Sequence, residues 1–420
     1  MNFKKLKKAK VSFVGKFIAA TILGMSAAFF APDVCKNTSF RVLAEGTITT
    51  EIALQLMETH YDKNTKTLNL SDTDFTEIGE YAFACRKNKN FEKTKIFEQI
   101  EEVILPPNCE KIGRGAFRGC DLCPYDIKIG LGSQLKKVTI PSSVNTIGDE
   151  AFGCCFRLEN VNFIDTPTTP SKLKFIGNNV FWRTSIKKLN IPNGCQEIGT
   201  GIFRCCCELE EFSIPRNVAF IKELAFVGCK NLKKFNVRNG TEITSYYLKD
   251  LKLPESIESI GASSFGGTMV VQCTVPSNVS TIEWSTFNSC FYLKSIELPK
   301  NLHSIGNQAL CQCRSLSQVT VPGQVKTIGD MCFFGCYRLN QVEALGNDIV
   351  LGKDCFGGCY KLQIVCFPNA EKITSTGPLI SDFMVKPIIL VSANTKINDK
   401  KANTEVDVNN TQPIKSCFLL

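Results

Sequence analysis

The sequence has few of the residues that catalytic and metal sites most often use. Only two of its 420 residues are histidines, His60 and His303, whereas a catalytic triad or a histidine-based metal site needs further ligands or a nucleophile at hand. It also lacks a glycine-rich phosphate loop and the motifs H-E-x-x-H and G-x-S-x-G. We therefore predict a protein that is not an enzyme and that uses neither a metal nor a cofactor.

An excess of charge is also missing outside the first residues. The formal net charge is +9, but residues 1–31 hold six lysines and no acid, which leaves +3 for the rest of the chain. A nearly balanced surface does not favour nucleic acid as a partner. Because long low-complexity tracts are absent too, we expect a folded chain with disorder only at its ends.

Long apolar runs are confined to the N-terminus. A lysine-rich start is followed by an uncharged stretch from Phe17 to Ala31, which is typical of a secretory signal and short for a membrane span. We predict a leader over residues 1–44, cleaved near Ala28 or near Ala44. An uncleaved N-terminal anchor is the alternative. No cell-wall sorting motif is visible near the C-terminus, so simple secretion stays open.

The last four residues, 417–420, match the C-a-a-X prenylation motif with leucine at the end. Cytosolic prenyltransferases do not meet an exported chain, so the two signals exclude one another in one molecule. Six lysines before an apolar run arise by accident less often than four terminal residues, so we favour a secreted or cell-surface protein. The alternative is a cytoplasmic protein prenylated at Cys417. In either case the membrane is a partner only through the leader or an anchor.

Prolines spaced by 23 residues reveal a repeat. Apolar residues follow Pro276, Pro299 and Pro322 at the same offsets, and the pattern is L-x2-[VIF]-x-[IVL]-P-x2-V-x2-I-G-x3-F-x2-C. Its spacing of five from Ile to Phe can be followed through eleven units. The residues at this Phe position are Phe83, Phe117, Phe152, Phe181, Phe203, Phe226, Phe265, Phe287, Leu310, Phe333 and Phe356.

Each unit predicts a strand, a turn and a short helical turn. Val319 and Val321 alternate with polar residues, and Pro322 ends the strand because proline has no N–H for the ladder. The step Ile328-Gly329 allows a turn that a Cβ atom would hinder, and the apolar spacings of five and three that follow fit a short helical turn. One unit cannot bury its own apolar edge, so stacking makes the core. We predict an α/β solenoid, with a parallel β-sheet on one face and short helical turns or irregular segments on the other.

The domain organisation follows from the extent of the repeat. We expect an N-terminal cap over 45–67, the solenoid over 68–368, and a C-terminal cap and tail over 369–420. The unit spacing is broken by insertions near 86–99, 124–134, 164–172 and 238–250. A solenoid extrudes insertions as loops, which either take part in recognition or merely decorate the surface.

Segments such as L-K-K-V-T-I-P-S-S-V-N-T-I-G-D-E-A-F, residues 135–152, resemble the BspA-type leucine-rich repeats, and the resemblance covers about residues 68–368. It implies a surface or secreted protein of a family found in bacteria and some parasitic protists, in which adhesion to host proteins or other cells is implicated. The Asn or Cys that commoner leucine-rich repeats place after the strand is absent, with Ser143 and Val144 there instead. We therefore expect no polar ladder to cap this turn.

The 22 cysteines suggest disulfides or zinc, but fourteen of them fit apolar positions of the repeat. A thiol packs as a small hydrophobic group, so we favour free, buried thiols. Neighbours in one column should lie about 5 Å apart, so bridging by oxidation is the alternative. The column three residues after the Phe position consists of Cys120, Cys155, Cys206, Cys229, Cys290, Cys313, Cys336 and Cys359.

The cysteines that do not fit the repeat are better disulfide candidates than those of the column. Cys120 and Cys123 have the spacing of half a zinc knuckle, but no second pair follows at a suitable distance, and both also fit packing positions. Cys35 falls in the expected leader. The cysteines that the repeat does not explain are Cys85, Cys154, Cys205, Cys207, Cys311 and Cys366.

The candidate binding face is the row of strand residues that point away from the core, since successive side chains of a strand alternate between its two faces. The row is polar and mixed in sign. We predict that it binds a protein of the host matrix, a cell surface or another macromolecule, and that an intracellular or prenyl-anchored scaffold is the alternative function. The row comprises Lys137, Thr139, Asn162, Lys188, Asn190, Glu211, Ser213, Lys234, Asn236, Lys252, Glu297, Thr320 and Glu343.

Overall fold

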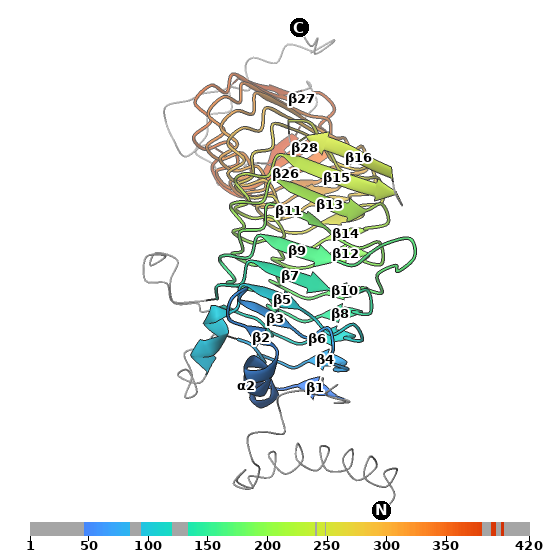
Figure 1. Cartoon of the computed structure of the whole chain (residues 1–420). Coiled ribbons are helices and arrows are strands. Elements are labelled where there is room, and N and C mark those ends of the chain that lie inside the picture. The colour runs from blue at the N-terminus through green and yellow to red at the C-terminus, as the bar shows by residue number, and fades with distance from the viewer. Residues whose placement is uncertain are drawn as a thin grey trace, which may run out of the picture. The chain divides into compact units, whose positions relative to one another are not determined.

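The computed structural model of the chain describes residues 46–84, 94–119, 133–239, 242–247, 249–379, 388–391 and 396–398. All of them belong to one compact unit, Leu43–Leu420 (Figure 1). The expected leader and the terminal prenylation motif lie outside the described residues. A search of the described segments finds no helix that is long and apolar enough to cross a membrane.

The strands predicted before each proline form what we call the first face. They pair in parallel from unit to unit, in four hydrogen-bonded blocks, and only β2–β3 and β15–β16 among these pairs are antiparallel in the described residues. The strands are β2 (Tyr61–Asp62), β3 (Thr67–Asn69), β5 (Glu102–Ile104), β7 (Lys137–Ile140), β9 (Asn160–Phe163), β11 (Lys188–Asn190), β13 (Glu211–Pro215), β15 (Lys234–Asn239), β16 (Glu242–Tyr247), β17 (Leu251–Lys252), β19 (Gln272–Thr274), β21 (Ser295–Glu297), β23 (Gln318–Val321), β25 (Gln341–Ala344), β27 (Ile364–Phe367) and β29 (Ile388–Val391).

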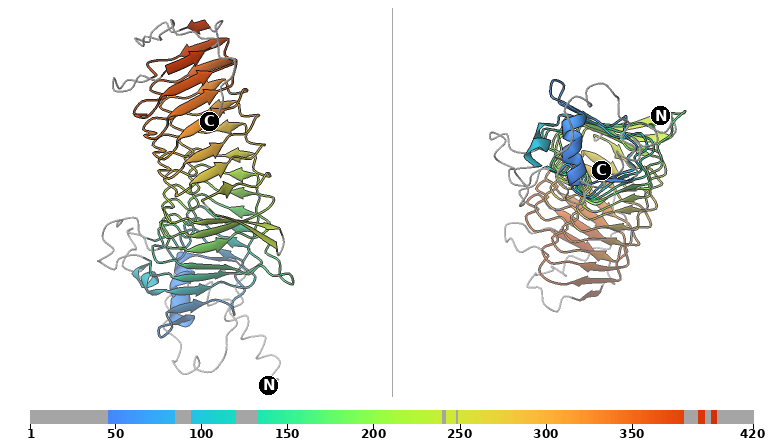
Figure 2. Two further views of the ribbon diagram at one scale, coloured as in Figure 1. Left: turned by 90° about the horizontal axis from the view of Figure 1, so that it is seen from above. Right: turned by 60° about the horizontal axis from the view of Figure 1, so that its bottom comes forward.

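A second face consists of short parallel strands, most of which end at the isoleucine of the Ile-Gly step. The sequence predicts only a turn there, so the strands of this face are an addition to the predicted fold (Figure 2). The prediction of an α/β leucine-rich-repeat solenoid is otherwise confirmed. Its strands are β1 (Thr47–Ile48), β4 (Glu77–Ile78), β6 (Lys111–Ile112), β8 (Thr146–Ile147), β10 (Phe175–Ile176), β12 (Glu197–Ile198), β14 (Phe220–Ile221), β18 (Ser259–Ile260), β20 (Thr281–Ile282), β22 (Ser304–Ile305), β24 (Thr327–Ile328), β26 (Asp348–Leu351), β28 (Lys372–Ser375) and β30 (Lys396–Asn398).

The segment around each Phe position forms irregular turns. Of the short helical turns and the irregular segments that were expected there, the structure has the irregular segments. Two residues with left-handed φ bracket the turn, for example Met331 at 52° and Gly335 at 70° on either side of Phe333. The turns of successive units are also joined by backbone hydrogen bonds, since Phe333 N–H donates to the carbonyl of Cys355 at 2.9 Å. The turn side thus holds the stack together in the same way as the two sheets do.

Helices lie beside the first coils of the stack. Helix α2 (Thr50–Thr59) begins after Thr49, whose hydroxyl accepts a hydrogen bond from the Ile52 N–H at 3.4 Å (Figure 1). It buries Leu56 and Met57, and so covers apolar surface at the end of the array. The 3-10 helix η2 (Lys95–Gln99) lies in the predicted insertion 86–99 and buries Phe97.

Two of the predicted insertions are therefore not simple extruded loops. Besides η2, the insertion near 238–250 contains β16, which pairs with β15 as an antiparallel strand of the first face. On the second face β14 pairs directly with β18, so the same insertion leaves that sheet uninterrupted. Most of the insertion near 124–134 lies outside the described residues.

The core is a ladder of aromatic rings from the Phe position. Rings of successive units stack with their centroids 5.1–5.8 Å apart, from Phe83 to Phe287 and again from Phe333 to Phe356. Leu310 is fully buried in the gap between these two runs. Since the same side chain recurs at one spacing, rings within each run stack on the phenylalanines of the neighbouring units.

The glycine of the Ile-Gly step is required by close approach of the chain. A Cβ atom added to Gly329 would lie 2.5 Å from the backbone nitrogen of Asn307 and 2.7 Å from the carbonyl carbon of Gly306. Its φ is not in the left-handed region, so the constraint is space between two backbones and not conformation. Glycine recurs at this position in most units, but Lys222 and Glu283 replace it in two of them, so the approach is not equally close at every corner.

We predict that Gly329→Ala lowers the free energy of unfolding by about 1–3 kcal/mol, because the added methyl group must push two backbones apart. Gly323→Ala is the matched control in the same unit, since its Cβ would meet only atoms of Leu345, the nearest being the carbonyl oxygen at 3.4 Å. The control should stay within about 0.5 kcal/mol of the parent. Urea unfolding followed by circular dichroism measures both, and equal losses would contradict the close-approach argument.

Candidate binding surfaces

All thirteen residues of the predicted binding row lie on strands of the first face, from Lys137 on β7 to Glu343 on β25. Their side chains alternate with buried ones, as Lys137 and Thr139 do with the fully buried Val138. The register puts equivalent positions of neighbouring units side by side, for example Thr320 and Glu343. The row is therefore a set of polar columns that run along the stack.

Two members of the predicted row are not at the surface. Ser213 and Asn236 are each only 1% exposed, so a partner cannot reach them, and the prediction is wrong for these two residues. They belong to a buried polar cluster instead. The Asn236 amide donates hydrogen bonds to Glu211 Oε1 at 2.6 Å and to Ser213 Oγ at 3.1 Å.

Ion pairs neutralise the lysines of the row, between neighbouring units for all of them except Lys252, which pairs with Asp250 of its own unit. Lys137 Nζ lies 2.7 Å from Glu102 Oε1, and Glu211 lies between Lys188 at 3.3 Å and Lys234 at 3.5 Å. Such pairs near the surface add little stability, but they offset the positive charge of the lysines in the N-terminal half of the row. Charge alone does not distinguish this half as a docking surface.

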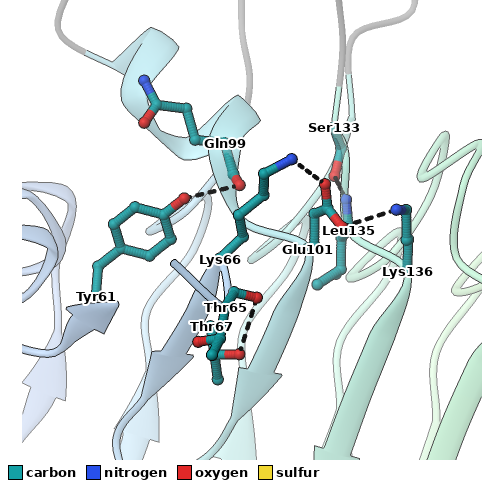
Figure 3. Close-up of polar contacts among 9 residues, drawn as sticks. All are labelled: Tyr61, Thr65, Lys66, Thr67, Gln99, Glu101, Ser133, Leu135 and Lys136. Carbon is teal, nitrogen blue, oxygen red and sulfur yellow. Dashed lines mark hydrogen bonds and ion pairs between the residues drawn. The ribbon is translucent and has the colours of Figure 1, made fainter. Parts of the chain in front are cut away.

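Figure 3 shows the same pairing just before the strands begin. The Glu101 carboxylate lies between the ammonium groups of Lys66, at 2.6 Å, and Lys136, at 2.7 Å. Hydrogen bonds from Lys136 and Lys66 lower the pKa of Glu101 to about 2, so it is ionised at neutral pH. Nearby, the Tyr61 hydroxyl donates to the backbone carbonyl of Gln99 at 3.0 Å. The cluster links three successive units.

A polar ladder that we did not predict caps the corner after the Ile-Gly step. Asn307 Oδ1 accepts the Asp330 N–H at 2.8 Å, and Asp330 Oδ1 accepts the Lys353 N–H at 2.7 Å. At the other corner, Ser143 Oγ donates to the Cys109 carbonyl at 2.6 Å. We had expected no polar ladder at the turn of Ser143, and the ladder lies at the corner after Ile-Gly, where the following Asp or Asn was the signal for it.

The cysteine column makes hydrogen bonds as well as apolar contacts. In each described member the thiol lies 2.9–3.3 Å from the carbonyl oxygen of the Phe-position residue one unit earlier. Thr184 and Thr268 occupy the same position in their units and donate to the carbonyls of Phe181 and Phe265. A small side chain with a donor suits this place, which explains cysteine better than apolar packing alone. The described members are Cys155, Cys206, Cys229, Cys290, Cys313, Cys336 and Cys359.

All the described cysteines are free thiols, including those we considered better disulfide candidates. Cys154, Cys311 and Cys366 are buried, whereas Cys205 and Cys207 are exposed. Cys85 and the pair at 120 and 123 lie outside the described residues. Within the described segments, no group of three or more His, Cys, Asp or Glu side chains could hold a metal ion.

One exposed surface was missed by the sequence analysis. The residue that follows the column position is large and exposed in consecutive C-terminal units, although an outward site of a solenoid is usually small or polar. The aromatic members are 40%, 37% and 55% exposed. We call this set the corner ladder: Phe291, Arg314, Tyr337 and Tyr360.

These strands and stacked columns define the chain as a leucine-rich-repeat solenoid. A family model described as a BspA-type leucine-rich repeat region of six copies matches residues 47–130, 131–251 and 244–363. The matches cover well over half of the sequence, so the chain belongs to the BspA-type leucine-rich-repeat family. Leucine-rich repeats are typically non-enzymatic scaffolds for protein interaction. A comparison with curated proteins finds no match.

Solved structures of bacterial leucine-rich-repeat proteins are similar to the chain. One from Eubacterium ventriosum is 21% identical, with 71% of this chain and 73% of that chain covered and a TM-score of 0.47. A leucine-rich cell surface protein of Faecalibacterium prausnitzii is 20% identical, with coverages of 82% and 88% and a TM-score of 0.42. The pneumococcal vaccine antigen PcpA is 17% identical, with coverages of 87% and 91% and a TM-score of 0.40.

We predict that thiol reactivity separates the exposed cysteines from the column. Burial raises the pKa of Cys206 and Cys359 to about 12 and that of Cys290 to about 11, so these thiols stay protonated and unreactive even at pH 9. Ellman's reagent should modify Cys205 and Cys207 in the folded protein, and the column only after denaturation.

Peptide mapping after a labelling pulse identifies which of these cysteines react. The variant with both Cys205→Ser and Cys207→Ser is the control, and it should lose the corresponding fast-reacting peptides. Labelling of Cys206 or Cys290 in folded protein at the rate of Cys207 would refute the buried column.

Proposed function

We propose that this chain is an exported, non-enzymatic adhesion module, secreted or held at the cell surface, that binds a protein of the host matrix or of another cell through its first face. The observation that supports this most is the regular display of polar side chains on consecutive parallel strands. Such a face offers many contacts at one spacing on a backbone that does not need to rearrange. Membership of the BspA-type family supports a protein-interaction module.

The C-terminal half of the row is more accessible to a partner than the N-terminal half, because its two glutamates are not held in ion pairs by any described residue. Glu297 and Glu343 form no ion pair with a described residue, and Thr320 lies between these two units. A partner that binds here has no ion pair to break and competes only with the hydrogen bond from Thr274 Oγ1 to Glu297 Oε2 at 3.0 Å, whereas binding over Lys188 or Lys234 competes with the ion pairs of Glu211. An interface of ordinary size needs about 800 Å² on each side, which several strands and their flanks can supply.

The test compares two threonines of one unit. Thr320 is exposed on the first face and Thr327 is exposed on the second, so Thr320→Arg and Thr327→Arg add the same bulk and charge to opposite surfaces. We expect binding to at least one member of a panel of purified matrix and cell-surface proteins. Thr320→Arg should weaken it at least tenfold and Thr327→Arg less than twofold, as measured by surface plasmon resonance. No binding across the panel, or equal effects of the two variants, would contradict the proposal.

A second candidate, an intracellular or prenyl-anchored scaffold, is favoured by one observation. Cys205 and Cys207 are exposed and free, as expected in a reducing compartment. Mass spectrometry of the protein from its own cells separates the two candidates. A processed N-terminus supports export, and an intact Met1 with a prenyl group on Cys417 supports the scaffold.

A further inference from the structure

We propose that the corner ladder, Phe291, Arg314, Tyr337 and Tyr360, is a docking site for an acidic, extended segment of a protein. This goes beyond the function proposed above, because it uses neither the first face nor any residue of the predicted row. The four residues come from four consecutive units and occupy the same position in each, one residue after Cys290, Cys313, Cys336 and Cys359. Stacking of the units therefore lines them up.

The side chains of the ladder are ordered by one another. The Arg314 guanidinium lies 4.4 Å from the centre of the Phe291 ring and 5.4 Å from that of Tyr337, so it is sandwiched between them. Tyr337 stacks on Tyr360 with centroids 5.5 Å apart and planes 23° from parallel. The Arg314 Nε–H also donates to Gln312 Oε1 at 3.2 Å. Binding to such a surface costs little further side-chain entropy.

The stacking also determines which parts of the rings a partner can touch. Arg314 and Tyr360 stack on the ring of Tyr337, so the edge and the hydroxyl group of this ring are the parts left for a partner. A sugar or a base stacks on an open ring face, which this ladder does not offer between its members. Edges and hydroxyl groups suit a polypeptide, and tyrosine and arginine are the residues that dominate protein interfaces.

The charge of the four segments that hold the ladder is of one sign. In the four segments that hold it, residues 288–295, 311–318, 334–341 and 357–364, the charged residues are Lys294, Arg314, Arg338 and Lys361, with no Asp or Glu. None of the four cations has an ion-pair partner among the described residues, in contrast to the lysines of the first face. The equivalent segment of an earlier unit, residues 204–211, holds Glu208, Glu210 and Glu211.

These features together define the partner. The four ladder residues are separated by three steps of about 4.8 Å, so the ladder spans about 15 Å, which matches an extended stretch of about five residues. Carboxylates of that stretch would meet Arg314, Arg338 and Lys361, and apolar side chains would pack on the edges of Phe291 and Tyr292. Met269 continues the same row into the preceding unit and is 41% exposed, which lengthens the apolar part.

The experiment measures binding of the full chain to a fluorescein-labelled peptide of alternating Glu and Leu, with a heparin oligosaccharide as the second probe. Arg314→Glu should weaken peptide binding at least tenfold. Lys230→Glu is the matched control, since Lys230 is an exposed cation at the same repeat position in an earlier unit, and it should stay within twofold. Tyr360→Ser, which shortens the ladder without a change of charge, should weaken binding at least threefold.

Three results would overturn the proposal: no binding of the peptide at 0.1 M salt, equal effects of Arg314→Glu and Lys230→Glu, or binding of heparin at Arg314 without binding of the peptide. Thermal melting of each variant shows that it is folded, as expected for exposed positions. Thr320→Arg, on the first face, should leave peptide binding unchanged. Failure of the ladder and failure of the first face are therefore separate outcomes.

Discussion

The structure depends on the backbone hydrogen bonds that hold each unit in register on the next. On the second face, Gly329 N–H donates to the Ile305 carbonyl at 2.8 Å, one unit earlier. On the turn side the direction is reversed, since Phe333 N–H donates to the Cys355 carbonyl, one unit later. Each unit thus gives and receives bonds on both sides, and a slip at any corner would break bonds at the others. The glycine of the Ile-Gly step is the local requirement for this approach.

Register converts a repeated residue into a column, and each column has its own role. Phenylalanine forms the stacked core, cysteine and threonine donate to carbonyls beside it, and Asp or Asn caps the corner. The same rule operates outside the core. Polar residues of the first face form cross-strand pairs, and the corner ladder forms a cation-π and aromatic stack. A solenoid therefore gains a binding surface by changing one repeat position in a few successive units.

The sequence predicts the columns well because spacing alone determines them. The eleven Phe positions, the prolines that end strands and the cysteine column are all visible as residues at fixed offsets. The strands of the second face were not predicted, because most of them are only two residues long. Alternation of apolar and polar residues cannot be seen in so short a run. Burial of Ser213 and Asn236, and the pairing of Glu211 with two lysines, depend on contacts between units that a single unit does not encode. The corner ladder was not predicted because its residues lie in the regular turns, outside both the strands and the insertions.

The central claim is that each unit packs only on its neighbours and in register. Deletion of residues 300–322 removes one complete 23-residue unit and joins Pro299 to Gly323, so the pattern of the repeat is unbroken and Phe287 comes next to Phe333. The decisive measurement is the thermal unfolding of this shortened chain, followed by circular dichroism. We expect a cooperative transition and the strand signal of the parent, with a midpoint lowered by a few degrees. A shortened chain without strand signal or without a cooperative transition would contradict the account.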